Sequence, residues 1–161
     1  MAGVLRFPAI GSEKTLPIYL EPERDEDESA EDFEERLEEF RIRRGIEATV
    51  KLVNRETARG WAMKWSAAIA RDQKRIGEAT KNGEPVTQVT PEGLQEMTRL
   101  QREIVAAAIV RVSGVIYGET PLDTVTDSTQ LIDMLDACEL LTPVAAAVSR
   151  AQAPSPKQGE P

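Results

Sequence analysis

The fold is decided by residues 90–114, TPEGLQEMTRLQREIVAAAIVRVSG. Thr90 is a typical N-cap, Pro91 suits the first helical position, and Glu92 places an acid in the first turn. Apolar residues then recur at helical spacing, and the segment 104–112 is apolar on nearly all sides. The pattern predicts a helix that is broken by Ser113-Gly114 and whose middle is the most buried segment of the molecule. The stripe consists of Leu94, Met97, Leu100, Ile104, Ala108 and Arg111.

A second amphipathic helix precedes this one and carries both tryptophans of the chain. Asn54 is its N-cap, and a turn at Lys81–Pro85 separates it from the helix that follows. Arg and Lys residues occupy the outer face, which is typical of a helix packed on one side. The inward positions at nearly helical spacing are Trp61, Trp65, Ile69 and Ile76.

Residues 46–52, IEATVKL, alternate between apolar and polar side chains. A period of two favours a β-strand. The alternative is a helix, because Ile46, Val50 and Val53 would also line one helical face.

Capping and turn residues also mark the elements on either side of these central segments. Two β-prone runs, 4–7 and 16–20, predict a small hairpin or two edge strands, since Pro17 is tolerated only at an edge. Ser29 and Gly45 bound a helix over about 30–44. Asp127 caps a short helix, and Thr142-Pro143 begins a last, Ala-rich helix that runs to about Gln152.

These elements predict an α+β fold that is mostly helical. Small N-terminal β-strands or a hairpin and one further strand are expected to pack on a bundle of about four to five helices. We divide the chain into an N-terminal β segment (1–20), a flexible acidic arm (21–28), a mainly helical body (29–152) and a disordered Pro-rich tail (153–161).

Charge is distributed unevenly along the chain. The net charge is −8, but residues 21–39 hold twelve acids and two arginines, whereas residues 41–76 hold ten bases and three acids. The simpler interpretation is a solvated acidic arm that lies against the basic segment at low salt. The functional alternative is an acidic arm that shields a basic, apolar-lined surface until a partner displaces it.

The composition argues against an enzyme. The chain has no His and a single cysteine, Cys138, which removes His-dependent catalysis, disulfide frameworks and Cys-cluster zinc sites. No phosphate-binding glycine motif occurs. The acidic run 25–29 fails as an EF-hand loop, because Ala30 and Arg36 occupy the sixth and twelfth positions. We therefore expect no catalytic residue, no cofactor and no metal site.

The chain also lacks the signals of a membrane or secreted protein. Its longest apolar run, Ile104–Val110, has seven residues, far fewer than the roughly 20 that span a bilayer. The first residues do not resemble a secretory signal. We expect a cytoplasmic protein, and the negative net charge argues against a general affinity for nucleic acid or anionic membranes.

The order of the elements, together with three quoted stretches, resembles the tail assembly chaperones of long-tailed bacteriophages. The stretches are TLPIYL, ATVKLVNRETARGWAMKW and VRVSGVIYGETPLDTVTDSTQLIDMLDACELLTPVAAAV, and the resemblance spans most of the chain. The positions typical of that layout are Val112, Gly114, Val115, Asp127, Leu131, Leu135 and Val144.

The resemblance implies a non-enzymatic factor in the cytoplasm of the bacterial host. Such a factor keeps the tape-measure protein soluble while tail tube protein assembles around it, and is absent from the finished virion. Composition suggests that partner contact lies on the second helix, although the simpler interpretation makes its tryptophans core anchors. The candidate partner-binding residues are Trp61, Trp65, Arg55, Arg59 and Lys64.

Two other functions compete with this one. The first is a structural virion component, either a head–tail connector or a minor tail protein, which would co-purify with particles. The second is a small helical regulator that binds nucleic acid through residues 41–76. It ranks last, because no helix-turn-helix signature occurs and the neighbouring acids would oppose phosphates.

Overall fold

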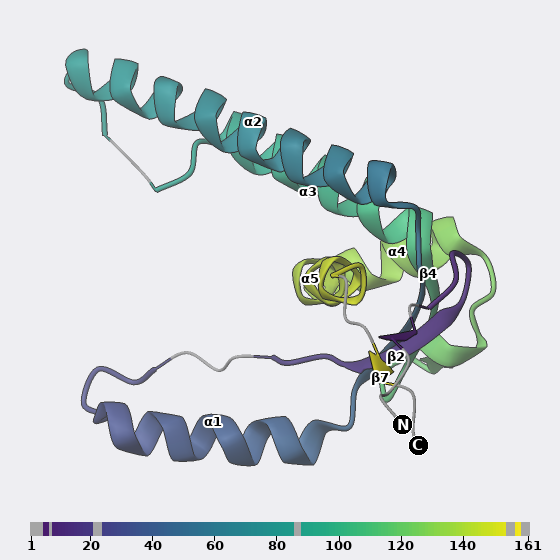
Figure 1. Ribbon diagram of the computed structural model, residues 1–161. Helices are drawn as coiled ribbons and strands as arrows, with labels where there is room; N and C mark the ends of the chain where they lie inside the picture. Colours follow the sequence, from purple (N-terminus) through teal and green to yellow (C-terminus); the bar gives the residue numbers. More distant parts are fainter. Residues whose placement is uncertain (1–4, 7, 21–23, 86–87, 154–156, 159–161) are drawn as a thin grey trace.

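The computed structural model describes the chain except for residues 1–4, 7, 21–23, 86–87, 154–156 and 159–161. The fold is α+β and mostly helical, as the sequence predicts (Figure 1). The helices are α1 (Ala30–Arg44), α2 (Arg55–Lys81), α3 (Pro91–Ala108), the 3-10 turn η1 (Leu122–Thr124), α4 (Ser128–Ala137) and α5 (Leu141–Ala151). The strands are β1 (Leu5–Arg6), β2 (Glu13–Pro17), β3 (Glu47–Lys51), β4 (Ile109–Ser113), β5 (Ile116–Tyr117), β6 (Thr120–Pro121) and β7 (Lys157–Gln158).

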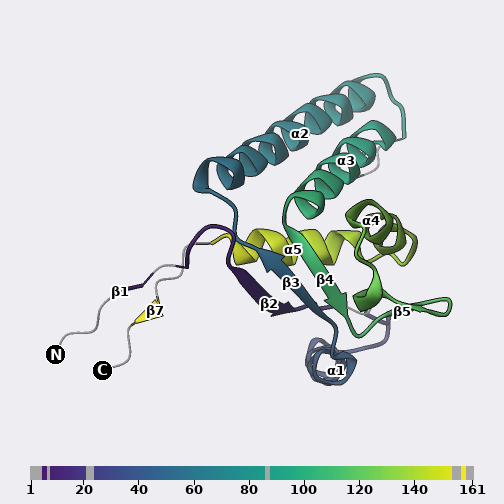
Figure 2. The ribbon, with the colours of Figure 1, turned by 90° about the vertical axis from the view of Figure 1, so that its right-hand side faces the viewer.

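A three-stranded antiparallel sheet with the order β2-β3-β4 forms the centre of the fold. Residues 46–52 therefore contain the predicted strand, β3, and the helical alternative for them is wrong. α5 lies across one face of the sheet (Figure 2). The core joins the sheet to α3 and α5, and its fully buried members include Val50, Val105, Val112 and Val148.

The long central helix ends earlier than predicted. α3 stops at Ala108, and Ile109 has the extended backbone angles φ −70° and ψ 134°. The prediction of a helix as far as Ser113-Gly114 is therefore wrong, because residues 109–113 form β4. β-Branched residues favour strands, and β3 offers a free edge to which they can hydrogen-bond. A run that is apolar on all sides suits a buried helix and a buried strand equally well.

The N-terminal β-prone runs form two separate pairings rather than a hairpin. β2 pairs with β3 as an edge strand that ends at Pro17, as the second alternative predicts. β1 pairs instead with β7, near the other end of the chain. β7 lies within residues 153–161, and the disorder predicted for this tail stays a prediction.

The helix N-caps lie where the sequence places them. The side chains of Ser29, Asn54, Thr90 and Asp127 each accept a hydrogen bond from the backbone N–H three residues later. α1 ends at Gly45, whose φ of 57° lies in the left-handed region that favours glycine.

The acidic helix α1 and the basic helix α2 lie on opposite sides of the molecule, with α5 between them (Figure 1). The expectation that the acidic and basic segments lie against each other is therefore wrong for α1 and α2. The shielding alternative stays a prediction. Of the acidic arm 21–28, residues 21–23 lie outside the described part, and its flexibility stays a prediction.

A candidate partner-binding groove between three helices

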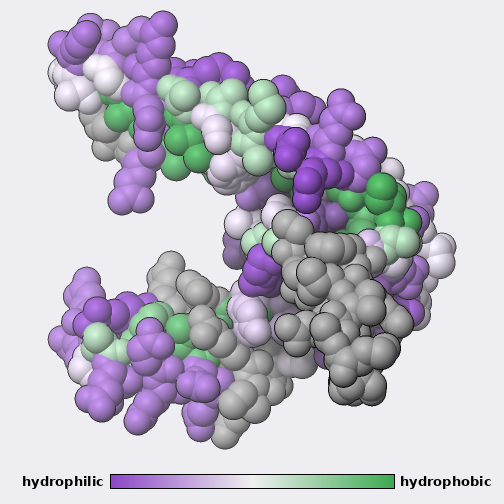
Figure 3. All heavy atoms as spheres, viewed as in Figure 1, coloured by the Kyte–Doolittle hydropathy of each residue, from purple (hydrophilic) through white to green (hydrophobic). Residues whose placement is uncertain are grey.

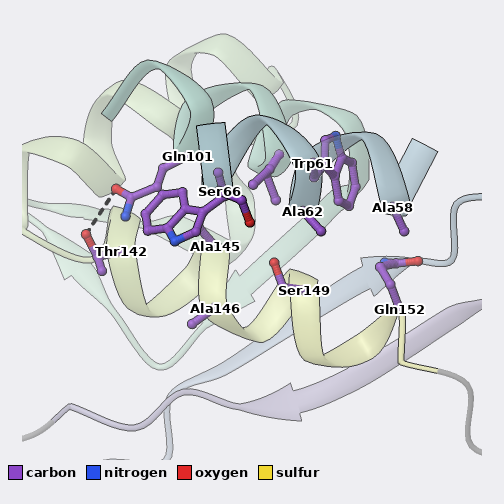
Figure 4. Close-up of a pocket in the computed structure, with 12 residues that line it drawn as sticks. Ala58, Trp61, Ala62, Ser66, Gln101, Thr142, Ala145, Ala146, Ser149 and Gln152 are labelled. Carbon is purple, nitrogen blue, oxygen red and sulfur yellow. Dashed lines mark hydrogen bonds between the residues drawn. The ribbon is translucent and has the colours of Figure 1, made fainter. Parts of the chain in front are cut away.

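A groove of about 520 Å³ opens where α2, α3 and α5 meet (Figure 4). Its position is set by the packing of α3 against both other helices. Every lining residue is uncharged. The lining residues are Ala58, Trp61, Ala62, Trp65, Ser66, Gln101, Ile104, Thr142, Ala145, Ala146, Ser149 and Gln152.

Small side chains on two helices create the open space. Ala58, Ala62 and Ser66 recur one turn apart on α2, so they share one face. On α5, Ala146 and Ser149 lie three residues apart and face the same groove. Neither set of side chains extends far enough to fill the space between the helices, which leaves an apolar surface open to solvent.

The two tryptophans line the groove in different ways. Trp61 is 6% exposed and belongs to the main hydrophobic core. Trp65 is half-buried and packs against the outside of that core. The core-anchor interpretation therefore describes Trp61, whereas the indole of Trp65 remains accessible from the groove. Its role in partner contact stays a prediction.

A glutamine side chain at each end of the groove forms hydrogen bonds within the protein. At one end, the hydroxyl of Thr142 donates to Oε1 of Gln101 over 3.1 Å (Figure 4). At the other, Oε1 of Gln152 accepts from the backbone N–H of Val53 over 2.8 Å, and its Nε2 donates to the carbonyl of Lys51 over 3.0 Å. The surface between the two ends suits apolar side chains from a partner.

The three basic residues predicted to contact a partner differ in their surroundings. Arg55 and Arg59 are exposed on α2 and do not line the groove. Lys64 forms an ion pair with Glu103 of α3, with 2.7 Å between Nζ and Oε1. Lys64 therefore joins α2 to α3, and only the two arginines have their charges available to a partner.

A buried carboxylate holds the far part of α2 against the start of α3. Asp72 is 3% exposed, and its carboxylate accepts hydrogen bonds from the Thr90 hydroxyl and, over 3.1 Å, from the Thr90 backbone N–H. The hydroxyl bond is the main cause that lowers the pKa of Asp72 below its ordinary value of 3.8. The hydrogen bond from Arg75 to Glu96, 2.9 Å long, likewise lowers the pKa of Glu96 below 4.5.

Sequence reasoning missed this network. The available signal was the position of Asp72, which continues the inward stripe of Trp65 and Ala68 at spacings of three and four residues. A charged residue on a buried stripe needs a partner, and Thr90 provides it as well as capping α3. The network fixes the helix pair that forms one wall of the groove.

The structure also places the acidic run and the cysteine that the sequence analysis considered. Glu28, in the acidic run, pairs with Arg36 over 2.8 Å. In the described ranges, no group of three His, Cys, Asp or Glu side chains is placed to hold a metal ion. Cys138 is half-buried against the core. No helix in the described part of the chain is long and apolar enough to cross a bilayer.

The space-filling view shows open space between the arm formed by α2 and α3 and the arm formed by α1 (Figure 3).

Comparisons with protein-family models, with curated proteins and with solved structures found no match for this chain.

Proposed function

We propose that this chain is a non-enzymatic tail assembly chaperone of a long-tailed bacteriophage or prophage. It binds the tape-measure protein and keeps it soluble in the host cytoplasm while tail tube protein polymerises. The observation that carries this proposal is the uncharged groove between α2, α3 and α5, which is open to solvent and lined by Trp65 and by small side chains.

The groove fits an amphipathic helix better than an extended strand. Its walls are helices, and the small residues on α2 and α5 allow a third helix to approach closely. Binding of a helix in an apolar groove uses side chains spaced three and four residues apart as anchors. A very long helical protein repeats such anchors many times, so one groove can hold successive segments weakly and release them.

The charge network argues against the nucleic-acid alternative. Three of the bases in residues 41–76 are already paired with acids on α3, Lys64 with Glu103 and both Arg71 and Arg75 with Glu96. Nucleic-acid binding depends on Lys and Arg side chains that are free to neutralise phosphates. A virion component remains the stronger alternative, since such a subunit would also use an apolar groove.

Co-expression tests the proposal. The phage's tape-measure protein is produced alone and together with this chain, and the soluble fraction of the tape-measure protein is measured. We expect soluble tape-measure protein only with the chain present, and no copy of the chain in purified particles. Stable incorporation into particles would support the virion component, and no change in solubility would contradict the chaperone.

A further inference from the structure

Two arginines flank the groove at the end where α2 begins. At 3.6 residues per turn, Arg55 lies one turn before Arg59, and Arg59 lies three residues before the lining residue Ala62. Both side chains are exposed. They therefore form a basic edge along the outer side of the α2 wall, which we call the arginine edge.

Neither arginine of this edge forms an ion pair with another residue that the structure describes. Two other cations near the groove are occupied: Lys64 pairs with Glu103, and Arg150 on the facing helix donates to the carbonyl of Pro17 and lies 5.3 Å from the centre of the Tyr19 ring. The arginine edge also lies at the N-terminus of a helix, where the helix dipole disfavours cations and favours carboxylates.

We propose that the groove selects an amphipathic helical segment with acidic residues on one flank, which bind the arginine edge and set the orientation of the segment. The lining of the α2 wall runs from Ala58 to Ser66, a rise of about 12 Å, so the segment needs about two helical turns. The charge preference is a property of the groove and does not depend on which protein carries the segment. That the segment belongs to the tape-measure protein rests on the proposed chaperone function.

The test uses two synthetic helical peptides that lack tryptophan. They share one apolar face and carry either Glu or Lys on the flank. Both tryptophans of the chain line the groove, so the fluorescence of the full chain reports occupation directly. We expect the Glu peptide to bind about tenfold more tightly than the Lys peptide at low salt, and the difference to shrink as salt screens the charges.

Charge reversal assigns the preference to the arginine edge. The double variant Arg55→Glu, Arg59→Glu should reverse the preference. The matched control Lys74→Glu, Lys81→Glu makes the same change in net charge at exposed positions of α2 that do not line the groove, and should keep it. Circular dichroism confirms that both variants remain folded.

Three results would overturn the inference. Equal binding of both peptides would remove the charge preference and leave the chaperone proposal intact, since that proposal is tested with the tape-measure protein. A fluorescence response to neither peptide would show that the groove does not take up such a helix. Self-association that is lost in the Arg55→Glu, Arg59→Glu variant would assign the arginine edge to the acidic α1 of a second copy.

Discussion

The helices α1 and α2 both project from the sheet, but they are held in different ways. α2 buries Trp61, Ala68 and Asp72 and exchanges ion pairs with α3 along its length. α1 has Leu37 as its buried side chain in the described part of the helix, and Leu37 lies outside the main core cluster. An exposed charge adds little stability, so a long charged helix is held in place by what it buries.

The difference assigns separate roles to the two arms. α2 and α3 form a fixed wall for the groove, because Trp61 of α2 belongs to the same core cluster as Leu100 and Ile104 of α3. α1 can open locally without exposing that core, since regions with few buried contacts open at low free energy.

Removal of the Trp61 side chain should have the largest effect on stability. Trp61 belongs to the core and also lines the groove, so Trp61→Ala leaves a cavity and should cost about 3–5 kcal/mol of unfolding free energy. A urea melt followed by circular dichroism measures the loss. A cost below about 1 kcal/mol would show that α2 is not anchored through this residue.

A single methyl group at the contact between α2 and α3 should have the next largest effect. A Cβ at position 93 would overlap the carboxylate of Asp72, which Thr90 holds in place, so Gly93→Ala should destabilise the protein by about 1–3 kcal/mol. Gly77→Ala is the matched control in open space on α2, and it should stabilise by about 0.5–1 kcal/mol. Equal effects of the two substitutions in urea melts would contradict the packing described.

The stabilisation that Asp72 provides should depend on pH. Its folded pKa is lowered, so the contribution is present above the ordinary value of 3.8 and is lost as the pH falls through the folded pKa. The difference in unfolding free energy between wild type and Asp72→Asn should therefore be full at about pH 7 and shrink toward about pH 2. Urea melts across this range measure it. A difference that stays constant would mean that the carboxylate is not held as a charged group.

Charge removal on α1 should have the smallest effect. Glu34 and Glu35 are exposed, so Glu34→Gln with Glu35→Gln should change the unfolding free energy by less than about 0.5 kcal/mol in a urea melt.

Amide exchange should also be faster in α1 and in residues 24–28 than in α3. Strong protection of residues 24–28 would contradict a weakly held acidic arm.

Local signals in the sequence predicted most of the helices. The caps at Ser29, Asn54, Thr90 and Asp127 could be read because capping depends on residues only a few positions apart. β4 could not be recognised, since its identity as a strand depends on pairing with β3, about sixty residues earlier in the chain.

The candidate site was predicted in part. Composition singles out Trp61 and Trp65 as the two tryptophans of the chain, one turn apart on a basic amphipathic helix, and the structure places both at the groove. The α5 wall, with Ala146 and Ser149, could not be found, because Ala-rich helices are common and nothing local shows which face meets α2. Composition groups Lys64 with Arg55 and Arg59, yet its ion pair with Glu103 depends on a contact between helices that the sequence does not reveal.

We propose that the groove binds a helical segment of the tape-measure protein through Trp65. The most direct test is a titration of the tape-measure fragment against Trp65→Ala, with Met63→Ala as the control. Met63 is 73% exposed on the same helix and does not line the groove. We predict that Trp65→Ala stays folded and binds about 30-fold or more weakly, as loss of an aromatic anchor does, whereas Met63→Ala binds like wild type. Wild-type affinity in a folded Trp65→Ala variant would show that Trp65 does not bind the segment.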